Sequence, residues 1–265
     1  MNKPRIILAA HRGDKFNYPE NTMPAFRATQ EAGLDMIETD LHLTRDGHLV
    51  IMHDRSALRT AGVDRNLDEM TLDEVRELDA GYLFDPKFKG EKVPTVIEFL
   101  EWIRDTELHV NWELKDYPYL VGDEHAFAAA DKLIELIEQY GMGERSIINS
   151  FSARVLEHIY RQHGHKYPIH GQGIYLSPRS KDTVSPDINY DDMMDWCCLY
   201  PIDKEKSVLE YKELFEYCHE RGIRPCLLLP DTEENYQKAI DLGCTMFTSN
   251  NILEADRILK KLGYR

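Results

Sequence analysis

Seven side chains able to bind a cation, hold a phosphate and move protons are spread over the first 115 residues of the chain. They are His11, Arg12, Glu38, Asp40, His53, Glu113 and Lys115. Carboxylates supply the oxygen ligands that hard divalent cations prefer, and guanidinium and ammonium groups pair with phosphate oxygens. Imidazoles exchange protons near neutral pH. The set therefore predicts metal-assisted chemistry at a phosphate, provided that the fold brings the side chains together.

The three acids are spaced so that they can face one site. Glu38 and Asp40 stand two residues apart in an apolar stretch, 36–43, that predicts a β-strand, so their side chains share a face. Glu113 and Lys115 repeat this spacing at the end of another predicted strand. Carboxylates crowded together repel one another unless a cation lies between them. We expect a Mg²⁺ or Ca²⁺ site, with a salt bridge or a solvated edge as the alternative.

The two histidines flank this predicted site. His11 ends an apolar segment and precedes Arg12, whose planar donor fork suits phosphate. Asp46-Gly47 predicts a hairpin turn that folds His53 back beside strand 36–43. Two facing imidazoles can act as acid and base on opposite sides of a bond. A packed core histidine is the alternative for His11, and pairing with Glu113 or Asp116 is the alternative for Lys115.

A short polar segment before the first helix has two interpretations. Either Asn21 or Thr22 is expected to cap a helix over 22–32. Glu20 and Asn21 are also candidates to orient the site through hydrogen bonds. Asp54 can orient the His53 ring or cap a turn.

Strand-like and helix-like segments alternate along most of the chain. The predicted strands are 6–10, 36–43, 108–114, 145–149, 169–175, 194–199, 223–229 and 244–248, and the predicted helices are 22–32, 95–104, 123–140, 152–163, 205–221, 232–242 and 251–262. This alternation predicts an α/β fold, a (β/α)8 barrel with its active site at the carboxyl ends of the strands. No glycine-rich phosphate loop follows the first strand, which disfavours a doubly wound sheet. We expect one catalytic domain over 1–265, with an insertion over about 54–93 after the second strand.

Composition excludes several classes of partner. The net charge of −15 would repel nucleic acids and anionic membrane surfaces. No apolar run is long enough for stable membrane insertion. The five cysteines show no metal-binding spacing, so we expect reduced core thiols in a cytoplasmic protein.

An ordered set of motifs resembles the glycerophosphodiester phosphodiesterase family, closely over about residues 6–115. The motifs are His11-Arg12-Gly13, Pro19-Glu20-Asn21-Thr22, Glu38-x-Asp40, Thr44-x-Asp46-Gly47, His53-Asp54, Pro94-Thr95 and Glu113-x-Lys115. The resemblance implies a TIM barrel with an insertion after strand 2. It also implies a metal-dependent enzyme of glycerol and lipid metabolism that splits glycerophosphodiesters into glycerol 3-phosphate and an alcohol.

The resemblance also implies a role for each residue of the set. His11 and His53 would be the acid–base pair, Arg12 and Lys115 would bind phosphate, and Glu38, Asp40 and Glu113 would bind the metal.

The C-terminal half departs from the family pattern. Cys226-Leu227-Leu228-Leu229 stands where a Trp-containing strand is common, and Thr248-Ser249 stands where a Thr-Asp pair is common. We expect the departures at Leu227 and Ser249 to bear on recognition of the alcohol or the glycerol.

Several alternatives remain compatible with the sequence. They are a phosphodiesterase for a different alcohol, a metal-dependent sugar isomerase or aldolase, and a catalytically silent barrel that binds ligands. Water and the glycerol 2-hydroxyl are both candidate nucleophiles, and either histidine can be the acid. Monomer and dimer are equally compatible with the acidic surface.

Overall fold

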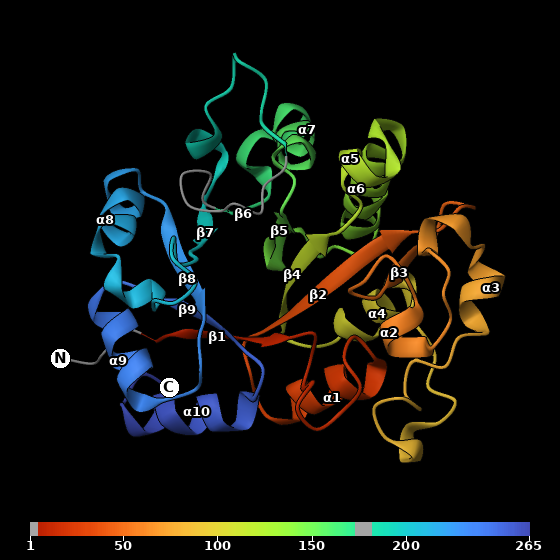
Figure 1. Cartoon of the computed structure of the whole chain (residues 1–265), viewed down its shortest axis with the longest axis horizontal. Coiled ribbons are helices and arrows are strands. Elements are labelled where there is room, and N and C mark those ends of the chain that lie inside the picture. The colour runs from red at the N-terminus through yellow and green to blue at the C-terminus, as the bar shows by residue number, and fades with distance from the viewer. Residues whose placement is uncertain (1–4, 173–181) are drawn as a thin grey trace.

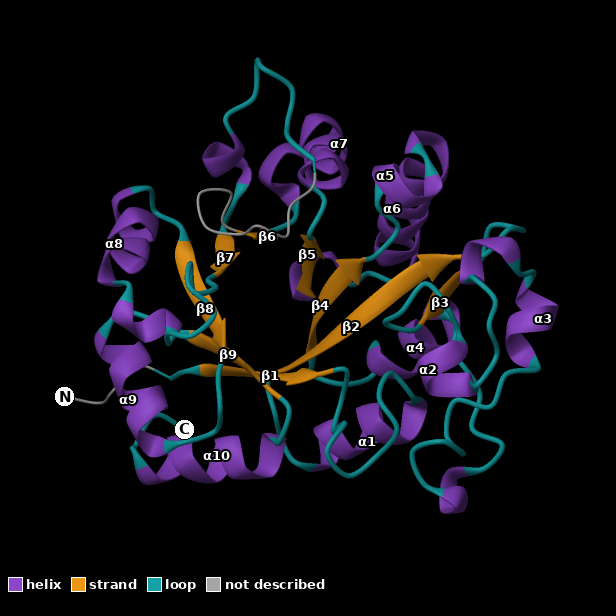
Figure 2. Ribbon diagram, in the orientation of Figure 1, coloured by secondary structure: helices purple, strands orange, loops and turns teal. Residues whose placement is uncertain are grey.

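Parallel strands form a closed barrel with helices around it (Figure 1 and Figure 2). The computed structural model describes residues 5–172 and 182–265. The parallel strands are β1 (Ile7–His11), β2 (Met36–Leu43), β4 (His109–Leu114), β5 (Ser146–Ser150), β6 (Ile169–Gln172), β7 (Trp196–Cys198), β8 (Arg224–Leu228) and β9 (Met246–Ser249). Each pairs with the next around the ring, and β1 closes the barrel by pairing with both β2 and β9. The predicted (β/α)8 barrel is confirmed.

An additional strand, β3 (Leu49–Ile51), lies antiparallel to β2. The turn between them contains Gly47 at φ +83°, a backbone conformation that suits glycine. This confirms the predicted hairpin, which returns the chain toward the carboxyl-terminal half of β2.

The longer helices lie outside the barrel and begin and end close to their predicted bounds. They are α1 (Met23–Glu31), α4 (Val96–Ile103), α6 (Asp123–Gln139), α7 (Ala153–His163), α8 (Lys212–Glu220), α9 (Glu233–Asp241) and α10 (Ile252–Lys261). The predicted helix 205–221 was too long, because a 3₁₀ turn at Val208–Glu210 precedes α8. Further 3₁₀ turns span Gly143–Arg145, Gly164–Lys166 and Tyr190–Met193.

The strand predicted over 169–175 is described only in part, and the strands predicted over 194–199 and 223–229 are shorter than predicted. The described part of the strand predicted over 169–175 ends at Gln172, and 173–175 lie outside the described residues. The strand predicted over 194–199 spans only Trp196–Cys198. Among the described helices, none is long and apolar enough to cross a bilayer.

The segment 54–93, here called the insertion after its prediction, shares a small apolar cluster with the β3 arm. It contains the helices α2 (Leu58–Ala61) and α3 (Leu72–Arg76), with 3₁₀ turns at Leu67–Glu69 and Pro86–Phe88. The cluster joins side chains of the β3 arm to the insertion through Val50, Met52, Ala57, Leu67, Met70, Val75, Leu78, Ala80 and Val93. Burial of these apolar groups therefore fixes the insertion against the hairpin that leads to His53.

The barrel interior is apolar at one end and polar at the other. Met36, Trp196 and Met246, each the first residue of its strand, belong to an interior apolar cluster. Glu38 and Asp40 follow further along β2, so acidic groups lie toward the carboxyl-terminal end. This is the end at which barrel enzymes place their active sites.

The turn after β1 depends on Gly13, and substitution there can be tested against a matched glycine. Gly13 has φ +76°, and a Cβ at this position would lie 2.8 Å from the Ala25 backbone carbon and Cβ. Gly33 has φ +69° but no atom within 4 Å of such a Cβ. We expect Gly33→Ala to cost about 1 kcal/mol from backbone strain. We expect Gly13→Ala to cost about 1–3 kcal/mol more, because the added atom overpacks the site. Urea unfolding of both variants measures the difference, and equal losses would contradict the tight approach.

Candidate active site

Three buried carboxylates meet where β2 and β4 run side by side. Glu38 and Asp40 come from β2, and Asp40 is paired in register with Glu113 of β4. One oxygen of each acid lies within 4.8 Å of the others, and their exposed fractions are 3%, 0% and 6%. Within the described chain, Glu38 Oε1 is buried without a hydrogen-bond partner, and Asp40 Oδ1 makes no hydrogen bond but pairs with Lys115 Nζ at 3.2 Å. Three buried carboxylates this close together, one of them with an unpartnered oxygen, fit a hard divalent cation.

The pKa values of the three acids shift in different directions. Burial, followed by the charges of Asp40 and Glu113, raises the pKa of Glu38 well above its usual range. Burial also raises the pKa of Glu113. Burial would raise the pKa of Asp40 too, but Lys115 and Arg12 outweigh it and the pKa falls. A bound cation would favour the ionised form of all three acids.

Arg12 is held over the acids by its backbone and its side chain. Its N–H donates to the Glu38 carbonyl oxygen at 2.9 Å and to Glu38 Oε2 at 3.1 Å. The guanidinium lies 3.1 Å from Glu20 Oε1 and 3.2 Å from Asp40 Oδ2. The backbone adopts φ +62°, an uncommon conformation for a residue with a side chain. Such backbone strain is often found at functional sites.

Lys115 lies between two of the acids. Its Nζ is 3.2 Å from Asp40 Oδ1 and donates to Glu113 Oε1. Burial would lower its pKa, but the Glu113 and Asp40 charges outweigh this and raise it. The interpretation of Lys115 as a partner of Glu113 is therefore confirmed, and its position also leaves it beside the predicted cation site.

His11 is fixed by a residue that sequence reasoning missed. Its Nδ1 lies 2.5 Å from Asn250 Oδ1, so the ring donates to a neutral amide. Its Nε2 faces Glu38 Oε2 at 3.8 Å. Burial, followed by the Arg12 charge, lowers the pKa of His11 to about 3. His11 is therefore a neutral imidazole with Nε2 directed at the acids.

His53 has an acidic partner instead. Its Nδ1 lies 2.6 Å from Asp54 Oδ1, so Asp54 orients the ring. Burial, with Lys115 and Arg12, lowers the pKa of His53, whereas Asp40 and Asp54 oppose this decrease. This bond leaves Nε2 as the free ring nitrogen.

Arg59 joins the insertion to the site. It donates to Asp54 Oδ2 and, at 2.6 Å, to Glu20 Oε1. The Glu20 carboxylate thus accepts hydrogen bonds from both Arg12 and Arg59. Sequence reasoning missed Arg59 because it belongs to no motif. A further missed pair is His42 and Asp116, with His42 Nδ1 2.6 Å from Asp116 Oδ1 and Nε2 3.3 Å from the His53 carbonyl oxygen.

Asn21 positions Asp40, but neither Asn21 nor Thr22 caps α1. Asn21 Nδ2 donates to Asp40 Oδ2 at 2.8 Å, and Asn21 Oδ1 accepts from Thr39 Oγ1 at 3.0 Å. Thr22 is at the N-cap position, yet its hydroxyl donates to the Pro19 carbonyl oxygen at 2.6 Å. The capping expectation was wrong because both side chains are engaged by the turn and by the strand beside it.

The two departures from the family pattern do not line the site directly. Leu227 is 1% exposed and packs in the layer between barrel and helices, whereas Leu228 at the end of β8 is 40% exposed. Ser249 Oγ donates to the Asp231 carboxylate at 3.0 Å and accepts from the Asn251 N–H at 3.0 Å. Ser249 thus fixes the loop that carries the partner of His11.

Six of the seven predicted residues are joined by these contacts, and His53 lies close enough to Asp40 for their charges to interact. A sequence profile of the glycerophosphoryl diester phosphodiesterase family matches residues 11–254. The chain belongs to this family.

Relatives with known names agree with this assignment. A glycerophosphodiester phosphodiesterase of Caldanaerobacter subterraneus subsp. tengcongensis is 40% identical over 165 residues, which cover 61% of this chain and 64% of the relative. Glycerophosphodiester phosphodiesterase 1 of Bos taurus is 30% identical, with 58% of this chain and 45% of the relative covered. The matched segment thus spans less than two thirds of either relative.

Solved structures share the fold. A putative glycerophosphoryl diester phosphodiesterase from Silicibacter pomeroyi aligns with TM-score 0.80 and 24% identity, covering 99% of this chain and 96% of that one. An Oleispira antarctica phosphodiesterase in complex with the product sn-glycerol-3-phosphate aligns with TM-score 0.78 and 19% identity, covering 96% of each chain.

The environment of His53 sets the direction in which its pKa responds to mutation. Because the Asp54 carboxylate raises the pKa of His53, we expect Asp54→Asn to lower that pKa further. Histidine Cε1–H shifts, followed by NMR titration of the chelator-treated protein, measure the change. Asp105→Asn is the control, because the Asp105 side chain is 80% exposed and follows α4 at the far end of β4. A higher pKa in Asp54→Asn than in the unaltered protein would contradict the Asp54–His53 bond.

Proposed function

We propose that this chain hydrolyses glycerophosphodiesters to glycerol 3-phosphate and an alcohol, with a divalent metal and with His11 and His53 as the acid–base pair. The observation that carries the proposal is the acidic cluster, which consists of the three buried acids. Arg12 and Lys115 pair with Asp40 of this cluster. The imidazole of His11 faces Glu38, and that of His53 interacts with the charge of Asp40. Membership in the family supports it. So does the glycerol 3-phosphate product bound by the Oleispira antarctica neighbour.

Glu38, Asp40 and Glu113 would hold Mg²⁺ or Ca²⁺. When bound, such an ion supplies positive charge that neutralises phosphoryl oxygens and stabilises charge developing there. The closeness of the three buried carboxylates and the unpartnered Oε1 of Glu38 support this assignment.

Arg12 and Lys115 bind the phosphate in this proposal. Both lie against Asp40, so their charges are already directed at the place where the acids converge. Glu20 holds the Arg12 guanidinium and Asn21 holds Asp40, which fixes the direction of both groups before substrate arrives.

The partners of the two imidazoles give them different proton roles. Asp54 stabilises a positively charged His53, whereas Asn250 offers His11 only a neutral acceptor. His53 is therefore assigned as the acid that protonates the leaving alkoxide. His11, whose Nε2 is unprotonated, accepts the proton of the attacking hydroxyl, which both water and the glycerol 2-hydroxyl offer.

A pocket beside the site suits the alcohol group. It has a volume of about 230 Å³ and is lined by Lys15, Glu20, Arg59, Leu83 and Phe84, among others. The insertion contributes both charged and apolar residues to the lining, namely Arg59, Leu83 and Phe84. We therefore assign the insertion a role in recognising the alcohol. We also assign a cytoplasmic location, which the five buried cysteines support because none of them forms a disulfide among the described residues.

The substrate and the metal requirement can be tested together. We expect release of glycerol 3-phosphate from at least one of the choline, ethanolamine, inositol and glycerol diesters, detected by a coupled enzyme assay. Chelator should abolish the release and Mg²⁺ or Ca²⁺ should restore it. Asp40→Asn should lower turnover by more than about 100-fold, because it alters a metal ligand. Glu101→Gln, at an exposed position on α4, is the matched control. Full turnover in chelator would refute metal dependence, and binding of glycerol 3-phosphate without any turnover would favour a silent barrel.

The two histidine roles are separated by changing the leaving group. We expect His53→Ala to lower turnover of a choline diester by about 10²–10⁴-fold, because its alkoxide needs a proton. The same variant should lose far less activity on the p-nitrophenyl ester of glycerol phosphate, whose leaving group departs without a proton. His11→Ala should lower both rates by similar factors. The opposite pattern would reverse the assignment of acid and base.

A further inference from the structure

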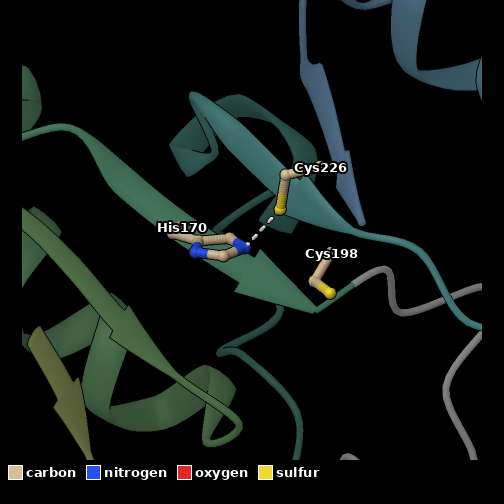
Figure 3. A group of neighbouring side chains, drawn as sticks. All are labelled: His170, Cys198 and Cys226. Atoms are coloured by element: carbon tan, nitrogen blue, oxygen red, sulfur yellow. Dashed lines mark hydrogen bonds between the residues drawn. The ribbon is translucent and has the colours of Figure 1, made fainter. Parts of the chain in front are cut away.

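A second group of metal-ligating side chains lies on the other side of the barrel from the acids. It consists of His170 on β6, Cys198 on β7 and Cys226 on β8, here called the thiol cluster (Figure 3). One ligand atom of each lies within 4.8 Å of the other two. Their exposed fractions are 3%, 8% and 1%. In the order of strands around the barrel, β7 stands opposite β2, so the thiol cluster is separate from the acidic cluster.

The strand register explains why these three residues meet. Cys198 is paired directly with Cys226 on the neighbouring strand. His170 lies one strand further along, two residues before Gln172, which is the register partner of Cys198. Cys198 belongs to the interior apolar cluster, whereas Cys197 packs in the outer layer with the helices. Side-chain alternation thus sends one of two adjacent cysteines into the barrel and the other out of it.

The histidine is already oriented toward the thiols. His170 Nε2 lies 2.9 Å from Cys226 Sγ, and Nδ1 lies 2.9 Å from Asn111 Nδ2. Asn111 is fully buried, and its Oδ1 has no hydrogen-bond partner among the described residues. A half-turn of this amide places Oδ1 where it accepts the Nδ1–H of His170. Nε2 is then unprotonated, and its lone pair is directed toward the thiols. In metal sites a carbonyl oxygen commonly orients the ligating histidine in this way, by accepting the proton of the other ring nitrogen.

The ligand types select the ion. Two thiolates and an imidazole suit Zn²⁺, which commonly takes nitrogen and sulfur ligands, and they do not suit Mg²⁺ or Ca²⁺. Binding exchanges the two thiol protons for one dication, so the buried site carries no net charge. Neutrality matters because an unbalanced charge in the barrel interior would be strongly destabilising.

We propose that His170, Cys198 and Cys226 form a zinc site that ties three strands of the barrel together. Among the residues that the structure describes, β5 and β6 share two register pairs and β6 and β7 share three, so an ion bound here would add a link between strands that are paired over a short described length. A tetrahedral ion held by three side chains leaves a fourth position for water. The site does not depend on the proposed phosphodiesterase activity.

Spectroscopy tests the site directly on the full chain. The protein is reduced with a phosphine, stripped with chelator and kept in excess Mg²⁺, so that the acidic cluster is occupied. We expect one equivalent of Co²⁺ to produce sulfur-to-metal charge-transfer absorption that Zn²⁺ abolishes. X-ray absorption of the zinc-loaded protein should show two sulfurs at about 2.3 Å and nitrogen at about 2.0 Å. Only oxygen and nitrogen neighbours, or no charge-transfer band, would overturn the proposal without recourse to any variant.

Variants then assign the ligands. Cys198→Ser and Cys226→Ser should each weaken Zn²⁺ binding by at least about 100-fold, and zinc should raise the melting temperature of the unaltered chain but not of these variants. Cys197→Ser is the matched control, because it removes a thiol from the same strand on the opposite face. Equal loss in all three variants would refute the assignment. So would a Cys198–Cys226 disulfide that persists in the reductant, or unchanged zinc binding in either of the first two variants.

Discussion

Charge balance among three buried carboxylates and two buried cations is the constraint on which the rest of this end of the barrel depends. Glu38, Asp40 and Glu113 cannot all be ionised at this spacing without positive charge beside them. Arg12 and Lys115 supply positive charge, yet burial, together with repulsion among the acids, still raises the pKa of Glu38 and of Glu113. This imbalance is the reason that we propose a dication between the acids and assign phosphate oxygens to the same two basic groups.

Much of the surrounding structure serves to keep these charges in place. The left-handed backbone at Arg12 and Asn21 brings one guanidinium and one amide onto Asp40. Gly13 allows the turn to approach α1 closely. Glu20 then links Arg12 to Arg59, so a charge network runs from the first strand into the insertion. Strain in the turn is thus tied to several ion pairs, which is how an uncommon conformation persists.

The acidic cluster could be predicted from the sequence because it depends only on side-chain alternation along a strand and on the order of strands in the barrel. Alternation along a strand puts Glu38 and Asp40 on one face, and barrel topology brings Glu113 beside them. The contact between His170 and Cys226 follows no such rule, because it depends on the relative register of strands far apart in the chain. Arg59 was missed for a related reason, since its position depends on how the insertion packs. Local motifs reveal residues that are neighbours in sequence, whereas contacts across the barrel appear only when the sheet closes.

The two imidazoles are carried by strands that differ in how extensively they are paired. His11 ends a strand that is paired with a neighbouring strand on both sides. His53 follows β3, which forms a short ladder with β2 and, on its other edge, one isolated bridge from Val50 to Thr95 and one hydrogen bond from the Ile51 N–H to the Pro94 carbonyl oxygen. Leu83 and Phe84 line the same pocket as Arg59, which bonds to Asp54, the partner of His53. A change in the loop that carries Leu83 and Phe84 can therefore shift His53 through Arg59 without moving β2 and β4. In the proposed function, a new wall for the alcohol pocket and a new setting of the proton donor are thus linked changes.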